Sequence, residues 1–179
     1  MTDESDTIQR VLNGETDAFA LLVDRYAGPI VRMIGNMTCD EATCEDLGQE
    51  VFLAAFAKLA TFDASRSRFS TWLFTIARNK SINAMKKKRP QLGLAPEQVD
   101  PTEPSEASER RELLASLDRA LEALPARQRR AFVLAEFEEL SYAEIAQIEG
   151  TRIGTVRSRI SRAKGKLADL LRRYGADEP

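Results

Sequence analysis

The sequence predicts an all-α protein made of two small helical domains, joined by a flexible acidic linker that contains prolines. Apolar residues recur at spacings of three and four along most of the 179 residues, which is typical of amphipathic helices. No stretch alternates apolar and polar residues for long enough to predict a strand. Residues 91–108 hold three prolines, several acids and few bulky apolar side chains, so they cannot bury enough surface to offset their ordering entropy. We therefore expect domains at residues 1–90 and 110–179, with the linker at 91–109.

The first domain is expected to open with two helices. A short helix over residues 7–13 ends at Gly14, and Thr16 is a suitable cap for the next helix. That second helix is predicted to break or kink at Gly28-Pro29, because proline lacks the backbone N–H and its ring clashes with the preceding turn.

Two more helices complete this domain. A third helix is predicted to begin near Glu41, where several acids suit the positive end of the helix dipole. Residues 62–67 read as a polar loop. The fourth helix is predicted to begin near Ser70 or Thr71 and to end at a basic run before Pro90.

The second domain contains a helix-turn-helix pattern. Two helices are expected within residues 113–137, separated at Pro125. Residues 141–144 read Ser-Tyr-Ala-Glu, a capping box that predicts the start of a short helix. Gly150 closes this helix, and Thr151 is a suitable cap for the last one. The apolar seam expected to pack inward on the last helix is formed by Ile153, Val156, Ile160, Ala163, Leu167 and Leu170.

Charge is sorted along the chain although the net charge is only −2. Residues 78–89 contain six basic residues and no acid, and residues 152–173 contain eight basic residues and one acid. The acids collect at the N-terminus, around residues 40–50 and in the linker. Two basic blocks of this kind predict two separate faces for a polyanion such as a nucleic acid.

The composition argues against an enzyme, a metalloprotein and a membrane protein. The chain has no histidine, the commonest general acid or base. Cys39 and Cys44 have no second pair of ligands to complete a zinc site, so we expect no metal or cofactor, although a redox role for the two thiols stays open. No apolar run approaches a membrane span and the start resembles no signal peptide, so we expect a cytoplasmic protein without membrane insertion.

The last helix presents side chains that suit DNA recognition. In a helix-turn-helix the second helix enters the major groove, where arginine pairs with guanine while serine and threonine reach bases or phosphates. The alternative is an amphipathic helix whose basic face is only solvated. The candidate face consists of Arg152, Thr155, Arg157, Ser158, Arg159 and Arg162.

Residues 62–89 carry a second candidate surface. Aromatic residues precede two asparagines and a lysine cluster, a combination that suits unstacked bases on a positive track. The alternative is that the aromatic residues are core and the lysines a solvated helix end, and for Trp72 we favour the core. A third surface, on residues 46–59, combines an apolar stripe expected in the core with outward-facing Gln49, Glu50 and Lys58, and specifies no partner by itself.

These residues resemble the extracytoplasmic-function sigma factors over about the whole chain. Residues 45–52 look like the polymerase-binding helix of that family, and residues 69–79 resemble its −10-reading segment. Residues 124–132 resemble the start of the core of its second domain. Residues 140–146 together with 154–163 resemble its −35-reading helix-turn-helix. The order and spacing of these stretches make the resemblance specific.

The resemblance implies binding to core RNA polymerase, to promoter DNA and to an anti-sigma protein. Docking on the clamp helices of the polymerase β′ subunit is expected of Asp46, Gln49 and Glu50. The linker would thread through the polymerase toward the RNA exit path, and the β subunit is a further expected contact of the protein. Contacts with the −10 element are expected of Phe62, Ser65, Arg66, Ser67, Arg78, Asn79, Lys80, Asn83, Lys86 and Lys87. Contacts with the −35 element are expected of Arg152, Thr155, Arg157, Ser158, Ser161 and Arg162.

Two positions depart from the family pattern. Glu149 stands where an apolar residue is usual before Gly150, and Arg152 replaces the usual proline at the start of the recognition helix. The modest net charge also leads us to expect that the free protein binds DNA poorly until polymerase positions its basic faces.

Other functions explain less of the sequence. A helix-turn-helix regulator that is not a polymerase subunit accounts for the second domain but leaves the first unexplained. A protein-binding adaptor leaves the two basic blocks without a purpose. A hydrolytic enzyme lacks a recognisable nucleophile–base arrangement or metal set.

Overall fold

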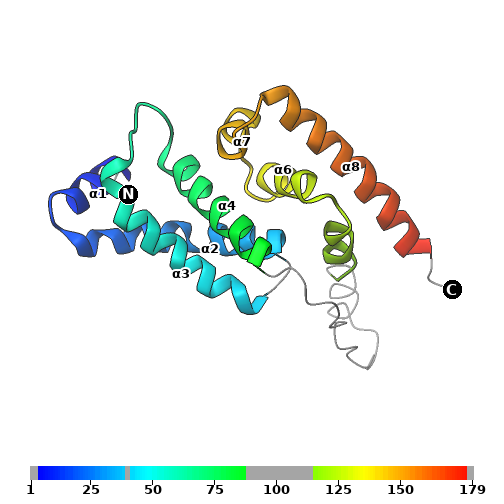
Figure 1. The fold of residues 1–179 in the computed structure, drawn as a ribbon, viewed down its shortest axis with the longest axis horizontal. Helices are drawn as coiled ribbons and strands as arrows, with labels where there is room; N and C mark the ends of the chain where they lie inside the picture. The colour runs from blue at the N-terminus through cyan, green and yellow to red at the C-terminus, as the bar shows by residue number, and fades with distance from the viewer. Residues whose placement is uncertain (1–3, 39–40, 88–114, 177–179) are drawn as a thin grey trace.

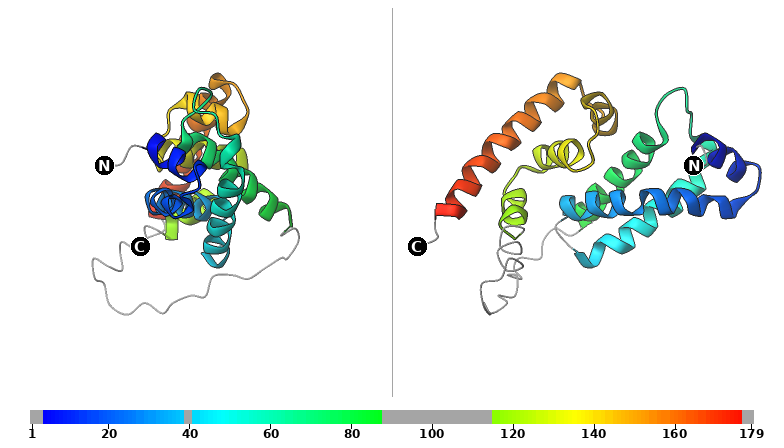
Figure 2. Two further views of the ribbon diagram at one scale, coloured as in Figure 1. Left: turned by 90° about the vertical axis from the view of Figure 1, so that its left-hand side faces the viewer. Right: turned by 180° about the vertical axis from the view of Figure 1, so that it is seen from behind.

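The protein folds as two packed groups of helices, seen in a computed structural model that describes residues 4–38, 41–87 and 115–176 (Figures 1 and 2). No strand occurs within these ranges, which confirms the all-α prediction. The predicted linker, residues 91–109, lies within the segment 88–114, which is outside the described residues. The first group contains α1 (Glu4–Leu12), α2 (Phe19–Thr38), α3 (Glu41–Lys58) and α4 (Phe69–Lys87). The second contains helical residues 115–122, α6 (Ala126–Glu136), α7 (Tyr142–Glu149) and α8 (Ile153–Ala176).

The first group is built on the mutual packing of α2, α3 and α4, with α1 against the start of α2 (Figure 1). Its core side chains come from the apolar spacings that predicted the helices. Full or nearly full burial is found for Ile30, Met33, Ile34, Met37, Val51, Ala55, Leu73 and Ala77. Their removal from water is the main favourable contribution to folding of this group.

Of the break or kink predicted at Gly28-Pro29, the break is wrong, because α2 runs without interruption from Phe19 to Thr38 with Pro29 inside it. Buried residues lie on both sides of the proline, including Leu22 and Ile30. Packing of both halves against α3 and α4 therefore offsets the hydrogen bond that proline cannot donate. Thr16 does not cap this helix either, since it begins a short 3₁₀ turn, Thr16–Ala18, that leads into α2.

The predicted capping box and glycine cap of α7 are both present. The Ser141 hydroxyl accepts a hydrogen bond from the Glu144 amide at 3.3 Å, and the Glu144 carboxylate accepts one from the Ser141 amide at 2.9 Å. Gly150 adopts a left-handed conformation with φ of 60°. Thr151 is not the cap of α8, because the amides of Thr155 and Val156 donate to the Arg152 carbonyl and α8 begins at Ile153.

A Gly150→Ala variant should lower the free energy of unfolding by about 1 kcal/mol, because an L side chain is disfavoured in the left-handed region. The cost is conformational, since a Cβ added at Gly150 meets no atom within 4 Å. Gly165→Ala is the matched control: its Cβ also meets nothing, but it lies inside α8. That variant should gain about 0.5–1 kcal/mol from helix propensity. Urea denaturation of both variants measures these opposite changes in the free energy of unfolding. Changes of the same sign would contradict the left-handed conformation assigned to Gly150.

The seam of α8 packs on α6 and on helical residues 115–122, as predicted for all but its first residue. Val156, Ile160, Ala163 and Leu167 are buried, and Leu170 is partly buried. Ile153, the first residue of α8, was expected to point inward but is 47% exposed.

The two groups of helices lie against each other. Helix α4 packs along α7, and α2 packs against α6 (Figures 1 and 2). A single hydrophobic cluster crosses this boundary and includes Ile30 and Ala77 from one side and Leu134, Ile145 and Ile148 from the other. The contact between the two domains was not foreseen from the sequence.

Candidate nucleic-acid interface

The polar loop before α4 stands on a cluster of aromatic rings. Phe62 lies 5.5 Å from both Phe69 and Trp72, measured between ring centroids, and Tyr26 of α2 lies 5.7 Å from Phe69. Phe69 is buried, whereas Phe62 and Trp72 are half-buried. The prediction that Trp72 belongs to the core is thus met in part. The cluster holds both ends of the loop in place beside the start of α4.

The loop itself is organised by Asp63. Its carboxylate accepts hydrogen bonds from the Ser65 amide at 2.9 Å and the Ser65 hydroxyl at 2.7 Å. Its carbonyl accepts a bond from the Arg66 amide at 3.1 Å. This is a turn closed by a side chain on its own backbone. It leaves Ser65 and Arg66 exposed and Ser67 half-buried, so these three predicted DNA contacts are accessible.

The hydroxyl of Ser65, followed by its amide, holds the pKa of Asp63 below its ordinary value. The stabilisation of the turn is therefore present above the ordinary pKa of aspartate and is lost as the pH falls through the lowered pKa. A Ser65→Ala variant should raise the pKa of Asp63 and move this loss to higher pH. NMR titration of the Asp63 carboxyl group measures the shift. Ser67→Ala is the control, because the hydroxyl that donates to the Asp63 carboxylate is that of Ser65. An equal pKa shift of Asp63 in the Ser67 variant would contradict the role assigned to Ser65.

The basic residues of α4 are only partly available to a ligand. Asn79, Asn83 and Lys86 are exposed, whereas the Lys87 side chain lies outside the described residues. Lys80 pairs with Glu50 of α3, with Nζ 2.7 Å from the carboxylate oxygen. The guanidinium of Arg78 donates to the side-chain oxygen of Asn79 at 2.9 Å and faces a carboxylate of the second domain.

That carboxylate belongs to Glu149, the last residue of α7. Arg130 of α6 donates to its two oxygens at 2.9 and 3.0 Å. Arg78 and Arg159 lie 3.4 and 3.3 Å away. The Glu149 side chain is only 1% exposed. The departure from the family pattern noted in the sequence is therefore a buried anion among three arginines.

Opposing effects act on the pKa of Glu149. Burial raises it, but the hydrogen bond and the charge of Arg130 lower it, and the charges of Arg78 and Arg159 act in the same direction. The result is a pKa below the ordinary value of glutamate, so the group is ionised at neutral pH. The sequence signalled only an unusual position before Gly150, since the three arginines are distant in the chain.

Helix α8 displays most of its predicted DNA contacts. Arg152, Arg157, Ser161 and Arg162 are exposed. Thr155 and Ser158 are half-buried, and the Ser158 hydroxyl donates to the Thr155 carbonyl at 3.0 Å. Arg159 is drawn away from this face by Glu149. The accessible set thus occupies the N-terminal half of the helix, as the helix-turn-helix pattern requires.

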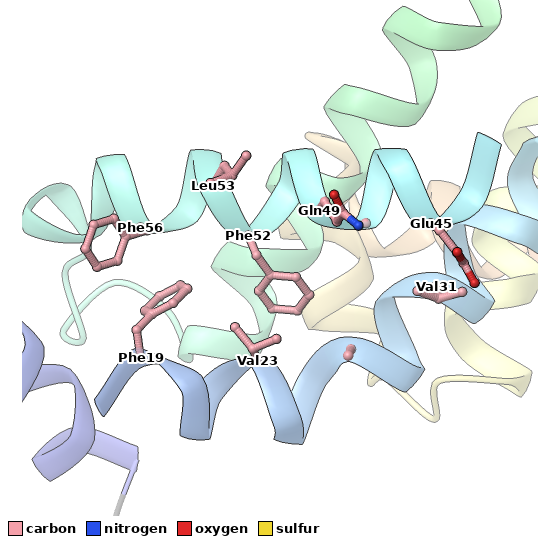
Figure 3. Close-up of a pocket in the computed structure, with 10 residues that line it drawn as sticks. Phe19, Val23, Val31, Glu45, Gln49, Phe52, Leu53 and Phe56 are labelled. Carbon is pink, nitrogen blue, oxygen red and sulfur yellow. The ribbon is translucent and has the colours of Figure 1, made fainter. Parts of the chain in front are cut away.

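Helices α2 and α3 form an apolar groove between them, which was not predicted from the sequence (Figure 3). Its volume is about 530 Å³, and its lining includes Phe19, Val23, Val31, Phe52 and Phe56. Phe56 was expected in the core, but it is 42% exposed and makes an edge-to-face contact with Phe19 at 5.1 Å. Leu53, at the edge of the groove, is 70% exposed.

One of the three predicted polymerase contacts, Gln49, lines this groove, and the other two lie on the same helix. Asp46, Gln49 and Glu50 are exposed on α3, and Gln49 is itself part of the lining (Figure 3). The signal available in the sequence was the width of the apolar pattern. Residues 51–56 carry apolar side chains around most of the helix, more than one core-facing stripe needs. Exposed apolar surface of this kind marks an interaction site.

Neither a metal centre nor a membrane span is found within the described part of the chain. Histidine, cysteine, aspartate and glutamate nowhere gather there in groups that could hold a metal ion. Cys44 is buried, and Cys39 lies outside the described residues. No described helix combines the length and apolar character needed to cross a bilayer.

Comparison with known families matches both halves of the chain. Residues 22–91 match the model of Sigma-70 region 2, and residues 114–167 match the model of Sigma-70 region 4. Two solved structures resemble the fold. CnrH in complex with the cytosolic domain of CnrY has a TM-score of 0.74 at 27% identity and covers 96% of this chain and 97% of its own. The sigma factor RpoE in complex with the anti-sigma factor NepR from Bartonella quintana has a TM-score of 0.69 at 28% identity and covers 86% and 96%.

Curated relatives are similar over nearly their full length. The ECF RNA polymerase sigma factor SigW of Bacillus subtilis is 34% identical, with 92% of this chain and 95% of the relative covered. The RNA polymerase sigma-H factor of Pseudomonas aeruginosa is 35% identical, with 92% of each covered. The ECF RNA polymerase sigma-E factor of Escherichia coli K12 is 33% identical, with 93% and 95% covered. The chain therefore belongs to the extracytoplasmic-function (ECF) sigma factors, the subunits that direct RNA polymerase to selected promoters.

Proposed function

We propose that the two domains of this sigma factor divide promoter recognition between them. The first, residues 1–90, reads the −10 element, and the second, residues 110–179, reads the −35 element, with residues 91–109 as the connection. The observation that carries this division is the presence of two separate accessible polar and basic surfaces, one on the Asp63 turn and α4 and one on α8. Two weak contacts joined in one chain act with raised effective affinity.

At the −10 element, the turn after Phe62 and the exposed Asn79 and Asn83 receive an unstacked base. The aromatic cluster beneath the turn supplies a rigid support, and the amide groups of the asparagines suit the reading of a nucleobase edge. Lys86, with Arg78, Lys80 and Lys87, holds the phosphate backbone. At the −35 element, Arg157 and Arg162 read base edges while Arg152, Thr155, Ser158 and Ser161 contact phosphates or bases.

Core polymerase binds the α2–α3 surface in this proposal. The apolar groove supplies area for a hydrophobic contact, and Asp46, Gln49 and Glu50 provide a polar, acidic rim. A hydrophobic centre with a polar rim is the usual anatomy of a protein interface. We assign this surface to the clamp helices of the β′ subunit, and the linker to the β subunit and the RNA exit path.

An anti-sigma protein is a further proposed partner. The solved RpoE structure, which covers both domains of this chain in the comparison, was obtained with the anti-sigma factor NepR. A protein that covers the α2–α3 groove or the DNA-binding faces would silence the sigma factor by occlusion. The protein acts by binding alone, without enzymatic activity or cofactor, and works in the cytoplasm, where polymerase and promoters are.

Run-off transcription tests the proposal. Core RNA polymerase is combined with the protein and a pool of promoter fragments from the source genome. Specific starts that require the protein, with shared sequences near −10 and −35, are the expected result. DNA binding without polymerase, together with no dependent start, would instead identify a helix-turn-helix regulator that is not a polymerase subunit.

A further inference from the structure

Glu149 is placed where the two domains meet. Of its three arginine partners, Arg130 and Arg159 belong to the second domain, whereas Arg78 belongs to α4 of the first. The Arg78 side chain is 23% exposed. Its guanidinium is therefore largely withdrawn from solvent and bound to a carboxylate of the opposite domain.

The boundary around Glu149 repeats the same charge arrangement. Arg32 of α2 lies 3.4 Å from Glu138, and Arg68 lies 3.4 Å from Glu144. In each ion pair the first domain provides the arginine and the second provides the glutamate. One contact has the arginine on the other side: Arg129 of α6, in the second domain, donates to the Met37 carbonyl of the first at 2.8 Å. These contacts surround the apolar cluster that the two domains share, so the closed arrangement is electrostatically and sterically complementary.

In the closed arrangement Glu149 binds the guanidinium of Arg78, which the proposed function assigns to DNA. A carboxylate and a phosphate compete for the same guanidinium, because both accept paired hydrogen bonds from it. While Glu149 holds Arg78, a DNA phosphate has to displace a buried and already paired anion. Helix α7, which carries Glu149, also packs along α4 and restricts the approach to this part of the helix.

We propose that Glu149 is an internal mimic of a DNA phosphate that keeps the free protein closed, with Arg78 occupied, until polymerase separates the two domains. This inference rests on the proposed role of Arg78 in DNA binding, but the closed form itself does not depend on that role. Of the three ion pairs made by Glu149, opening removes only the one with Arg78. Arg130 and Arg159 continue to pair with Glu149 within the second domain, so no unpaired buried charge is left there.

The first test measures shape. An Arg78→Glu variant of the full chain places a carboxylate against Glu149, and like charges at this distance repel. X-ray scattering of the free protein should shift to a larger radius of gyration. Lys80→Glu is the matched control, because Lys80 lies on the same helix but pairs with Glu50 inside the first domain. No shift in the Arg78 variant, or an equal shift in both, would overturn the closing role of this contact.

The second test measures DNA binding without polymerase. Glu149→Gln removes the charge and keeps the shape, and should tighten binding of the free protein to a promoter fragment by about tenfold, as the competent fraction rises. Glu136→Gln is the control, because Glu136 pairs with Lys164 inside the second domain and its loss changes the net charge equally. Equal affinities of the two variants, measured at one salt concentration, would overturn the phosphate-mimic role.

The two tests remain decisive if a variant is unstable or the proposed function is wrong. If Glu149→Gln unfolds, the scattering of the Arg78→Glu protein still decides whether the contact closes the molecule. If wild-type protein supports no run-off transcription, the proposed function fails while the shape change stands. Normal transcription by the wild type, with neither a shape change nor an affinity change in the variants, refutes the closing role alone.

Discussion

A Leu53→Asp variant should fold normally and lose about 100-fold in affinity for core RNA polymerase. Leu53 is 70% exposed at the edge of the α2–α3 groove, so the free protein loses little by the change. In the complex, the new carboxylate would be buried beside apolar side chains. Burial of an unpaired charge at an interface costs roughly 3 kcal/mol, which corresponds to about 100-fold in the dissociation constant.

Leu21→Asp provides the matched control for this prediction. Leu21 is also an exposed apolar residue in a helix of the first domain, at 45%, and does not line the groove. Both variants therefore exchange the same residue types and change the net charge equally. Fluorescence titration of labelled protein with core polymerase measures the affinities. Similar values for the two variants would place the polymerase contact elsewhere on the protein.

Arg157→Ala and Arg162→Ala should each weaken use of the −35 element by about 10- to 100-fold, because a bidentate arginine–base contact contributes roughly 1–3 kcal/mol of discrimination. Both side chains are exposed on the N-terminal half of α8, so the stability of the protein should change little. The loss should be specific: promoters already altered at the paired base should respond less to the substitution than the intact promoter does.

Arg172→Ala is the control on the same helix. Arg172 is 76% exposed and pairs with Asp169 at 3.0 Å, far from the turn that leads into α8. Run-off transcription from intact and altered promoters, at one salt concentration, measures all three variants. A uniform loss on every promoter would assign the arginines to phosphate contacts, and no loss would remove α8 from the recognition surface.

Local signals in the sequence predicted the helices well, whereas contacts between distant segments had to come from the structure. The capping box at Ser141 and the left-handed Gly150 are encoded within a few residues, so both were predicted correctly. Of the break or kink predicted at Pro29, the break was wrong because burial on both sides of the proline overrides its local preference. The cap at Thr151 was wrong because α8 begins two residues later.

The candidate binding surfaces show the same difference between local signals and contacts of distant segments. The exposed positions of α8 and of the Asp63 turn follow from periodicity and turn chemistry. The α2–α3 groove depends on two helices whose apolar patterns are each wider than a core stripe, and neither pattern alone reveals a groove. The pairing of Glu149 with Arg78 joins residues 71 positions apart, and no local rule connects them.

The uninterrupted course of α2 through Pro29 has a thermodynamic consequence. The α2–α3 groove follows α2 from Phe19 to Val31, and Arg32 and the Met37 carbonyl, just beyond it, contact the second domain. The two sites therefore adjoin on one continuous helix. Coupling between them is reciprocal: whatever free energy binding at the groove adds to or removes from domain separation, domain separation adds to or removes from binding at the groove.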